Sequence, residues 1–352
     1  MITAEGLVLN YFPLLKKKST LFRIVCGVTR FMIRESDFQK FSRDNPHARG
    51  FNFIDLVMDY FDFDVSLAEQ ERAQIPSSGR LVIVANHPLG SLDGMALLRL
   101  VSQVRRDVKI VANNHLSVVS ALDDLIFPVD NMGGATTRQQ IKAIHQYLND
   151  EGAVIIFPAG EVSRLTVKGV RDGLWHKGFL KIARATKSPI LPIHVRARNS
   201  MVFYLLSMAF RKLSTVLLVR EMFGQAKKTV PLRIGGLVEP EGLSGVAAND
   251  NALAKLFRSH VEQIGKGKKG HFKTYRAVAQ AERAKAVFAE LTNHEILGET
   301  PDGKVIYLAK DIWDTVLLRE IGRLREMSFR AVGEGTGRSR DFDDYDHNYY
   351  HL

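Results

Sequence analysis

The sequence has little cysteine and no long apolar run. Its single cysteine, Cys26, excludes an intramolecular disulfide framework and zinc ribbons and favours a reducing compartment. No stretch reaches the roughly 18 uncharged apolar residues that a membrane-spanning helix needs. The best candidate, 200–210, is followed by Arg211 and Lys212. The basic run 16–18 comes too late for a signal peptide. We therefore expect a cytoplasmic protein without a spanning helix.

Acidic residues are in deficit. The 49 lysine and arginine residues outnumber 38 aspartate and glutamate residues, giving a net charge of +11. Such a surface attracts nucleic acid, anionic lipid or an acidic protein. The Gly- and Lys-rich stretch 265–276 carries no nucleic-acid recognition motif, so we interpret it as a loop and expect no nucleic-acid partner. Hydrophobic residues make up 45%, which is enough for a core, and the length predicts roughly two domains.

Two segments combine apolar and basic residues. Segment 14–34 places apolar residues at helical spacing among basic ones: Leu21, Val25, Val28 and Met32. It predicts a basic amphipathic helix, which either lies on an anionic membrane surface or packs on a core with its charged face in solvent. Segment 200–219 has large apolar residues, which predict either a membrane-dipping helix or a buried one.

Short β-branched runs alternate with helix-length stretches in the middle of the chain. The runs are 81–85, 108–112, 153–157, 190–195 and 232–235. The stretches between them include 93–105, 136–149 and 173–187. The alternation predicts an α/β sandwich with a largely parallel central sheet, covered by helices on both faces. Active sites of such sheets gather where the strands end.

A first polar motif, NHPLGSLDG, occupies residues 86–94 at the end of a predicted strand. A histidine and a nearby carboxylate, here His87 and Asp93, form a general-base arrangement, because the carboxylate orients the imidazole and stabilises the imidazolium. The helix dipole would keep Asp93 ionised, while Gly90 and Gly94 let the two side chains converge. Taken alone, a capped turn with an incidental histidine is the simpler interpretation.

A second polar motif, FPAGEVSR, occupies residues 157–164 after the next predicted central strand. Its proline and glycine turn the chain, so that Ser163, Arg164 and backbone N–H groups could meet an anionic or polar headgroup. The alternative is a strand-ending turn in which Glu161 caps a helix. Two polar loops that each follow a buried strand predict one shared active site. No metal-ligand set is evident, because the other histidines are scattered.

Both motifs resemble those of the glycerolipid and lysophospholipid acyltransferase superfamily, which has an NHxxxxD block and an FPEGTRS-like block. They are most similar to its hemolysin-like, ornithine-lipid branch, which has NHPxGxxDG and FPAGEVSR. Further blocks at 127–130, 175–178 and 189–194 also resemble the family, and the resemblance covers about residues 60–245. It implies an acyltransferase.

The chain departs from the general superfamily pattern at three positions. One extra residue separates His87 from Asp93, Ala159 occupies the usual place of the glutamate, and Glu161 comes after it. These shifts belong to the hemolysin-like branch. They favour its substrates over ordinary glycerophosphate acceptors.

By this resemblance, His87 is the general base that deprotonates an acceptor hydroxyl, and Asp93 orients and charge-stabilises it. The resemblance implies binding of substrate polar groups by the other motif residues: Asn86, Gly90, Phe157, Pro158, Gly160, Glu161, Ser163 and Arg164. The acyl donor would be an acyl carrier protein or coenzyme A thioester, with no further cofactor. The acceptor would be a lyso-lipid, either a lyso-ornithine or other aminolipid or a lysophospholipid. We therefore expect a peripheral protein on the anionic inner membrane, with segment 200–219 dipping into it.

The C-terminal residues 319–352 resemble the opening of the GNAT-like N-acyltransferase domain that makes the 3-hydroxyacyl amide of ornithine-type lipids. We interpret them as a truncated domain without N-acyltransferase activity; the alternative is a tail that packs on the first domain. The predicted segments are membrane-association helices, an acyltransferase domain, a helical linker and the start of the truncated domain: 1–60, 61–250, 251–300 and 301–352.

A second hypothesis is a membrane-binding, hemolysin-like protein without acyl-transfer activity. It rests on the apolar and basic segments 14–34 and 200–219. Lysis by insertion should survive His87→Ala, whereas acyl transfer should not.

Overall fold

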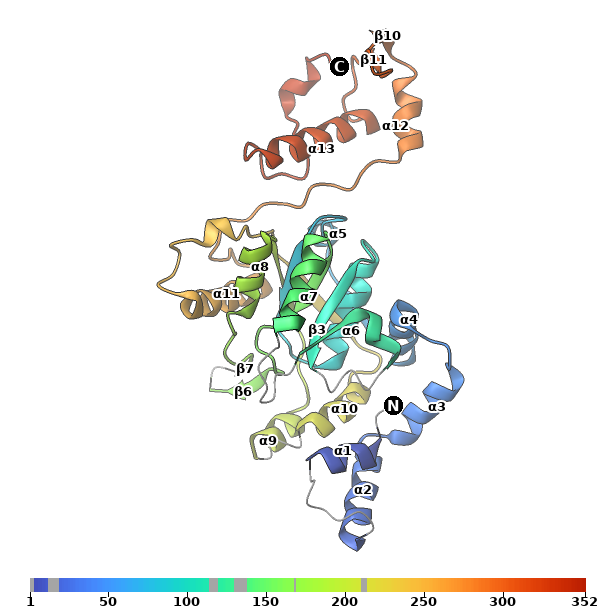
Figure 1. Cartoon of the computed structure of the whole chain (residues 1–352), viewed down its shortest axis with the longest axis vertical. Coiled ribbons are helices and arrows are strands. Elements are labelled where there is room, and N and C mark those ends of the chain that lie inside the picture. The colour runs from blue at the N-terminus through green and yellow to red at the C-terminus, as the bar shows by residue number, and fades with distance from the viewer. Residues whose placement is uncertain (1–2, 12–18, 114–119, 130–137, 168, 210–213) are drawn as a thin grey trace. The chain divides into compact units, whose positions relative to one another are not determined.

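The structure is a computed structural model of the whole chain (Figure 1). It describes residues 3–11, 19–113, 120–129, 138–167, 169–209 and 214–352. The chain forms two compact units: a larger one of residues 1–72 and 78–273, and a smaller one of 73–77 and 274–352. The predicted linker 251–300 is therefore divided between the units. Its first helix, α11 (Asp250–Gly265), packs against the sheet of the larger unit.

A seven-stranded sheet forms the centre of the larger unit, in the order β1-β9-β8-β2-β5-β3-β4. Its strands are β1 (Asp64–Ser66), β2 (Leu81–Ala85), β3 (Val108–Asn113), β4 (Ile126–Val129), β5 (Ala153–Ile156), β8 (Ile190–Val195) and β9 (Thr229–Ile234). Neighbouring strands run parallel, except that β8 and β9 are antiparallel. The predicted α/β fold with a largely parallel sheet is confirmed.

Helices cover the sheet because its central strands are apolar along their whole length. Every residue of β2 and β5 is buried, which requires cover on both faces. Three helices share a hydrophobic cluster with β2 and β5: α7 (Arg138–Asn149), α8 (Gly178–Thr186) and α11. Another, α6 (Ser91–Ser102), contacts β3, β5 and α4 (Gly50–Tyr60). The central strands of the sheet are thus covered by α6, α7, α8 and α11.

Two groups of helices lie next to each other beyond the sheet (Figure 1). The first comes from the N-terminus: α1 (Ala4–Tyr11), α2 (Thr20–Met32) and α3 (Glu35–Asp44). The second comprises α9 (Met201–Ala209) and α10 (Ser214–Gly224), so segment 200–219 forms parts of two helices. The basic runs 16–18 and 211–212 lie outside the described residues. Of the described helices, none is long and apolar enough to cross a bilayer.

The smaller unit has its own modest core. It contains α12 (Ala284–Leu291), an antiparallel hairpin of β10 (Glu295–Glu299) and β11 (Val305–Leu308), and α13 (Val316–Ala331). Four buried apolar residues form its cluster: Ala309, Ile312, Leu317 and Leu318. The acidic stretch 341–350 is tied to α13, because Asp346 accepts a hydrogen bond of 2.7 Å from Arg325.

Candidate active site

The two polar motifs meet because their strands are neighbours. β2 and β5 pair in parallel, so the loops that follow them leave the sheet at the same edge. The backbone N–H of Ser163, in the second motif, donates to the carbonyl of His87, in the first, at 2.8 Å. The sequence prediction that both motifs contribute to one place therefore agrees with this contact.

His87 and Asp93 face each other in this place. The Nδ1 atom of His87 lies 3.2 Å from Oδ2 of Asp93, an ion-pair distance, although the angle is not that of a hydrogen bond. The Asp93 side chain is fully buried, while 18% of the His87 side chain is exposed. Oδ2 of Asp93 also accepts from the backbone N–H groups of Leu89 (2.7 Å) and Gly90 (3.1 Å). A fixed carboxylate thus faces one ring nitrogen, which leaves Nε2 for a substrate.

The turn between the two residues depends on its glycines. Gly90 precedes α6 with a φ of 92°, a region that side chains with a Cβ rarely adopt. A Cβ on Gly94 would lie 2.9 Å from Cδ1 of Ile110, so a larger residue here would force the Ile110 side chain of β3 to shift. Asp93 sits in the first turn of α6, where the helix dipole favours its charge.

Phe157 forms one wall of the site. Its ring stacks on the imidazole of His87, with 4.0 Å between centroids and 22° between planes. The stack fixes the ring plane of His87 from the second motif. Pro158 is buried, and its carbonyl accepts from the backbone N–H of His176 at 2.9 Å, so this motif is also anchored to the chain before α8.

Asp172 connects the two motifs, and sequence reasoning missed it. Its Oδ1 accepts from the backbone N–H of His87 (3.2 Å) and from the Ser163 hydroxyl (2.5 Å). Its Oδ2 accepts from the indole N–H of Trp175 (2.9 Å). Burial raises the pKa of the Asp172 carboxyl, and these hydrogen bonds oppose the rise. The available signal was an acidic residue between the second motif and the block at 175–178.

Ser163 is buried, and its hydroxyl donates a hydrogen bond to Asp172 within the protein. Glu161 and Arg164 form an ion pair, with 3.1 Å between Oε2 and Nη2. The Nη1 atom of Arg164 is buried and has no hydrogen-bond partner among the described residues. Gly160, with a φ of 65°, makes the turn that leads to this pair. Arg164 of the second motif therefore has a hydrogen-bond donor that no described residue accepts from.

Asn86 holds the site to the neighbouring strand. Its amide exchanges two hydrogen bonds with the backbone of Val195, at 2.9 and 2.7 Å. Asn199 makes a second tie, because its amide donates to the carbonyl of Pro88 at 3.0 Å. The backbone N–H of Asn199 in turn donates to the hydroxyl of Tyr204 at 3.0 Å. Segment 195–199 is therefore fastened along the first motif.

The apolar helices α9 and α10 border the same loops. Val162 shares a small buried cluster with Phe203, Tyr204 and Leu217. A Cβ on Gly90 would come within 3.4 Å of Leu218 in α10. The site therefore has an apolar flank. In the described part of the chain, no group of three histidine, cysteine or acidic side chains is placed to hold a metal ion.

Comparison with known proteins fits this geometry. The model of an acyltransferase family matches residues 14–268, which is well over half of the chain. The chain belongs to this acyltransferase family. The match spans both motifs, Asp172 and the helices α2, α9 and α10, and so covers most of the larger unit. The predicted enzyme class and glycerolipid acyltransferase superfamily are confirmed, and the acyltransferase is of the lipid type.

Individual relatives resemble different parts of the acyltransferase. A lyso-glycine lipid O-acyltransferase of Phocaeicola vulgatus is 28% identical over 227 residues, which cover 62% of this chain and 80% of that protein. A glycine N(alpha)-acyltransferase of Bacteroides thetaiotaomicron is 48% identical over 59 residues, 16% of this chain and 18% of that protein. The GNAT-like resemblance has this partial support. The ornithine-lipid branch stays a prediction.

A solved structure also aligns with much of the chain. The 1-acyl-sn-glycerophosphate acyltransferase PlsC of Thermotoga maritima gives a TM-score of 0.38 at 18% identity, covering 74% of this chain and 85% of that one.

Proposed function

We propose that the protein transfers a fatty acyl group from a thioester to the hydroxyl of a lyso-lipid, with His87 as general base and Asp93 as its partner. The observation that carries the proposal is the pair itself: a fully buried carboxylate 3.2 Å from Nδ1 of a partly exposed imidazole. Such a carboxylate selects the tautomer with a free Nε2 and stabilises the imidazolium that forms.

The reaction needs only these groups and the two substrates. Nε2 of His87 takes the proton of the acceptor hydroxyl while the oxygen attacks the thioester carbonyl. The tetrahedral intermediate collapses as the carbon–sulfur bond breaks, and the imidazolium returns the proton to the leaving thiolate. An ester and a free thiol result, with no covalent acyl-enzyme and no cofactor.

The acceptor in this proposal is a lyso-aminolipid, and a glycine headgroup is the first choice. The relative from Phocaeicola vulgatus is named for a lyso-glycine lipid. The headgroup carboxylate would meet Arg164, whose buried Nη1 has an unused donor. Glu161 would hold Arg164 in place through their ion pair. A lyso-ornithine lipid or a lysophospholipid is the competing acceptor.

The donor in this proposal is an acyl carrier protein or coenzyme A thioester.

The enzyme in this proposal works peripherally on the cytoplasmic face of the inner membrane. Support for this membrane contact comes from apolar side chains that face solvent on α2 and α9: Leu21, Ile24, Val28, Phe31, Met201, Val202, Leu205 and Met208. Phe31 is 79% exposed. Exposed apolar patches of this kind mark membrane or protein contacts.

The test is acyl transfer in vitro, read by mass spectrometry, with both thioesters and a panel of lyso-lipids. His87→Ala and Asp93→Asn should each lower kcat by at least about 100-fold, the usual contribution of acid–base catalysis. His47→Ala, which removes an exposed histidine, is the matched control and should keep full activity. A substantial rate in folded His87→Ala protein would refute the base assignment.

The competing hypothesis is a hemolysin-like, membrane-binding protein without transferase activity. The same exposed apolar helices would serve it. It predicts vesicle leakage that His87→Ala leaves unchanged, together with no product from any acceptor in the panel.

A further inference from the structure

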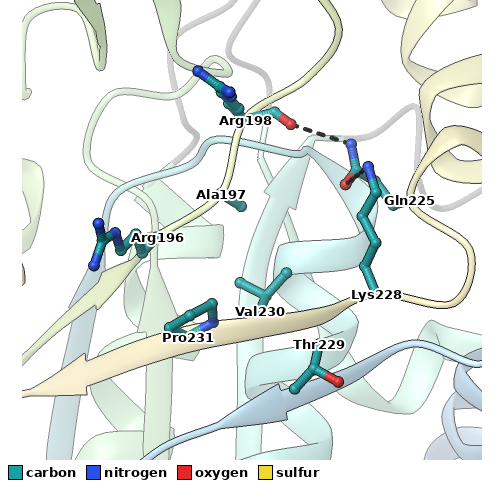
Figure 2. A pocket seen from close by; sticks show the side chains of 8 residues that line it. All are labelled: Arg196, Ala197, Arg198, Gln225, Lys228, Thr229, Val230 and Pro231. Atoms are coloured by element: carbon teal, nitrogen blue, oxygen red, sulfur yellow. Dashed lines mark hydrogen bonds between the residues drawn. The ribbon is translucent and has the colours of Figure 1, made fainter.

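A basic hollow lies beside the catalytic loops, at the same edge of the sheet. Its cavity of about 290 Å³ is lined by the segment after β8, the end of α10 and the start of β9: Arg196, Ala197, Arg198, Gln225, Lys228, Thr229, Val230 and Pro231 (Figure 2). β9 runs antiparallel to β8, so its first residues meet the last residues of β8 at this edge.

The hollow is fixed to the first motif. Segment 195–199 is fastened at one end by Asn86, which bonds to Val195, and at the other by Asn199, which bonds to Pro88. Arg196 and Arg198 lie between these two ties. Because His87 lies between Asn86 and Pro88 in the chain, these ties hold the backbone of the two arginines beside the loop that contains His87.

The third cation is also positioned. The amide of Gln225, which is buried, donates to the carbonyl of Arg198 at 3.2 Å and accepts from the ammonium of Lys228 at 3.2 Å. Figure 2 shows Gln225 between these two partners. The backbone N–H of Arg196 donates to the carbonyl of Pro231 at 3.0 Å, which closes the opposite side.

Within the described part of the chain, the three cations have no anionic partner. Among the described residues, no carboxylate lies within 4 Å of Arg196, Arg198 or Lys228. The nearby Glu221 is occupied, because its oxygens accept from the N–H and the hydroxyl of Ser200. Elsewhere in the unit, arginines such as Arg34, Arg99 and Arg233 are paired with acids. Three cations that line one hollow and have no described carboxylate paired with them favour an anionic ligand.

We propose that Arg196, Arg198 and Lys228 form a subsite for the anionic group of a substrate, a phosphate or a carboxylate, while its reacting end lies at His87. Two sources fit this chemistry: the phosphate that links pantetheine to the acyl donor's carrier, and the charged headgroup of the lyso-lipid, which would then bind here rather than at Arg164. The identity of these two candidates rests on the proposed function, but the presence of the anion subsite does not.

The experiment compares each candidate with its uncharged counterpart by titration calorimetry. One arm uses 4′-phosphopantetheine and pantetheine; the other uses a short-chain N-(3-hydroxyacyl)glycine and its methyl ester. The wild-type protein should prefer the charged ligand of one pair. Arg196→Gln/Arg198→Gln should weaken the binding of that charged ligand by about tenfold or more, because each lost hydrogen bond is charge-assisted. Binding of the uncharged counterpart should change less than about twofold.

Two further variants control for charge and folding. Arg138→Gln/Lys255→Gln removes two exposed cations on α7 and α11 and should leave the binding of both ligand pairs unchanged. Arg196→Lys/Arg198→Lys keeps the charge and should restore most of the preference. The arm that responds names the source. If the folded Arg196→Gln/Arg198→Gln variant keeps the wild-type preference for the charged over the uncharged ligand in both arms, the proposed subsite is refuted. Failure of acyl transfer alone would overturn the proposed function and leave the binding result standing.

Discussion

Asp172 accepts from the His87 backbone, the Ser163 hydroxyl and the Trp175 indole, so it fixes the backbone of the proposed base. We expect Asp172→Asn to lower kcat by about 10- to 100-fold, because one amide oxygen cannot accept all three bonds and a small misplacement is costly. The Tm should fall only moderately.

KM for the acceptor should change less than kcat, since Asp172 acts through His87. Asp44→Asn, at an exposed aspartate in α3, is the control and should behave like wild type. An unaltered kcat in Asp172→Asn would show that this carboxylate serves only folding.

Buried His260 should make the free energy of unfolding of the protein depend on pH. Burial, with a smaller effect of His271, lowers the pKa of His260 to about 4. Its Nδ1 accepts from the backbone N–H of His271 at 2.8 Å, which requires the neutral ring. Because the folded pKa lies below the unfolded value of about 6.5, the unfolded chain binds more protons between these two values.

This ring therefore contributes stability that is full above pH 6.5 and lost as the pH falls toward 4, by about 3 kcal/mol in total. Urea unfolding at a series of pH values measures it. His260→Asn keeps an acceptor near the Nδ1 position and should flatten the slope in this window. His47→Asn, at an exposed histidine, should keep the slope. Equal slopes in all three proteins would contradict the prediction.

At the scale of elements, the outward faces of α2 and α9 form the proposed membrane-binding surface. We expect Phe31→Glu and Leu205→Glu each to weaken binding to anionic vesicles several-fold, because each puts a charge into an apolar surface. Sedimentation with vesicles measures this. Phe288→Glu, at an exposed phenylalanine of α12 in the smaller unit, should have no effect. Equal loss in all three would count against a defined surface.

Deletion of residues 1–34 should also weaken vesicle binding, in a salt-dependent way, because it removes basic residues with the apolar face. Point variants are the cleaner test. Ala4 and Ile33 form a buried cluster against Val219 of α10, so the deletion also uncovers part of the larger unit.

The apolar spacing in segment 14–34 predicted α2 (Thr20–Met32) but left its orientation open. In the structure, Phe22 and Cys26 face the protein, whereas Leu21 and Val28 of the predicted stripe face solvent. The sequence could not decide this, because α2 has apolar residues on both sides. The packing of α1 and α10 against α2 selects which side is covered.

At the scale of the whole molecule, the two units differ in how much apolar surface they bury. The chain has two tryptophans, and each unit contains one: buried Trp175 in the larger and Trp313 in the smaller. We expect the smaller unit to unfold at a lower denaturant concentration, because its cluster has only four buried residues.

Trp313→Phe leaves Trp175 as the only indole and reports on the larger unit. Its fluorescence curve, subtracted from that of the wild-type protein, gives the transition of the smaller unit. Two separated midpoints are the expected result. Coincident midpoints would mean that the units unfold as one cooperative body.

The sequence by itself determined the enzyme class, the largely parallel sheet and the strands after which the polar motifs come. These features are local: a run of β-branched residues predicts a strand, and a motif of eight or nine residues contains its own chemistry. Only the tertiary structure decided which side chains face the site. Asp172 meets His87 across 85 positions, and Asn199 meets Pro88 across 111. Such contacts depend on strand order and helix packing, which no local pattern encodes, so the tie through Asp172 and the basic hollow emerge only when the chain is folded.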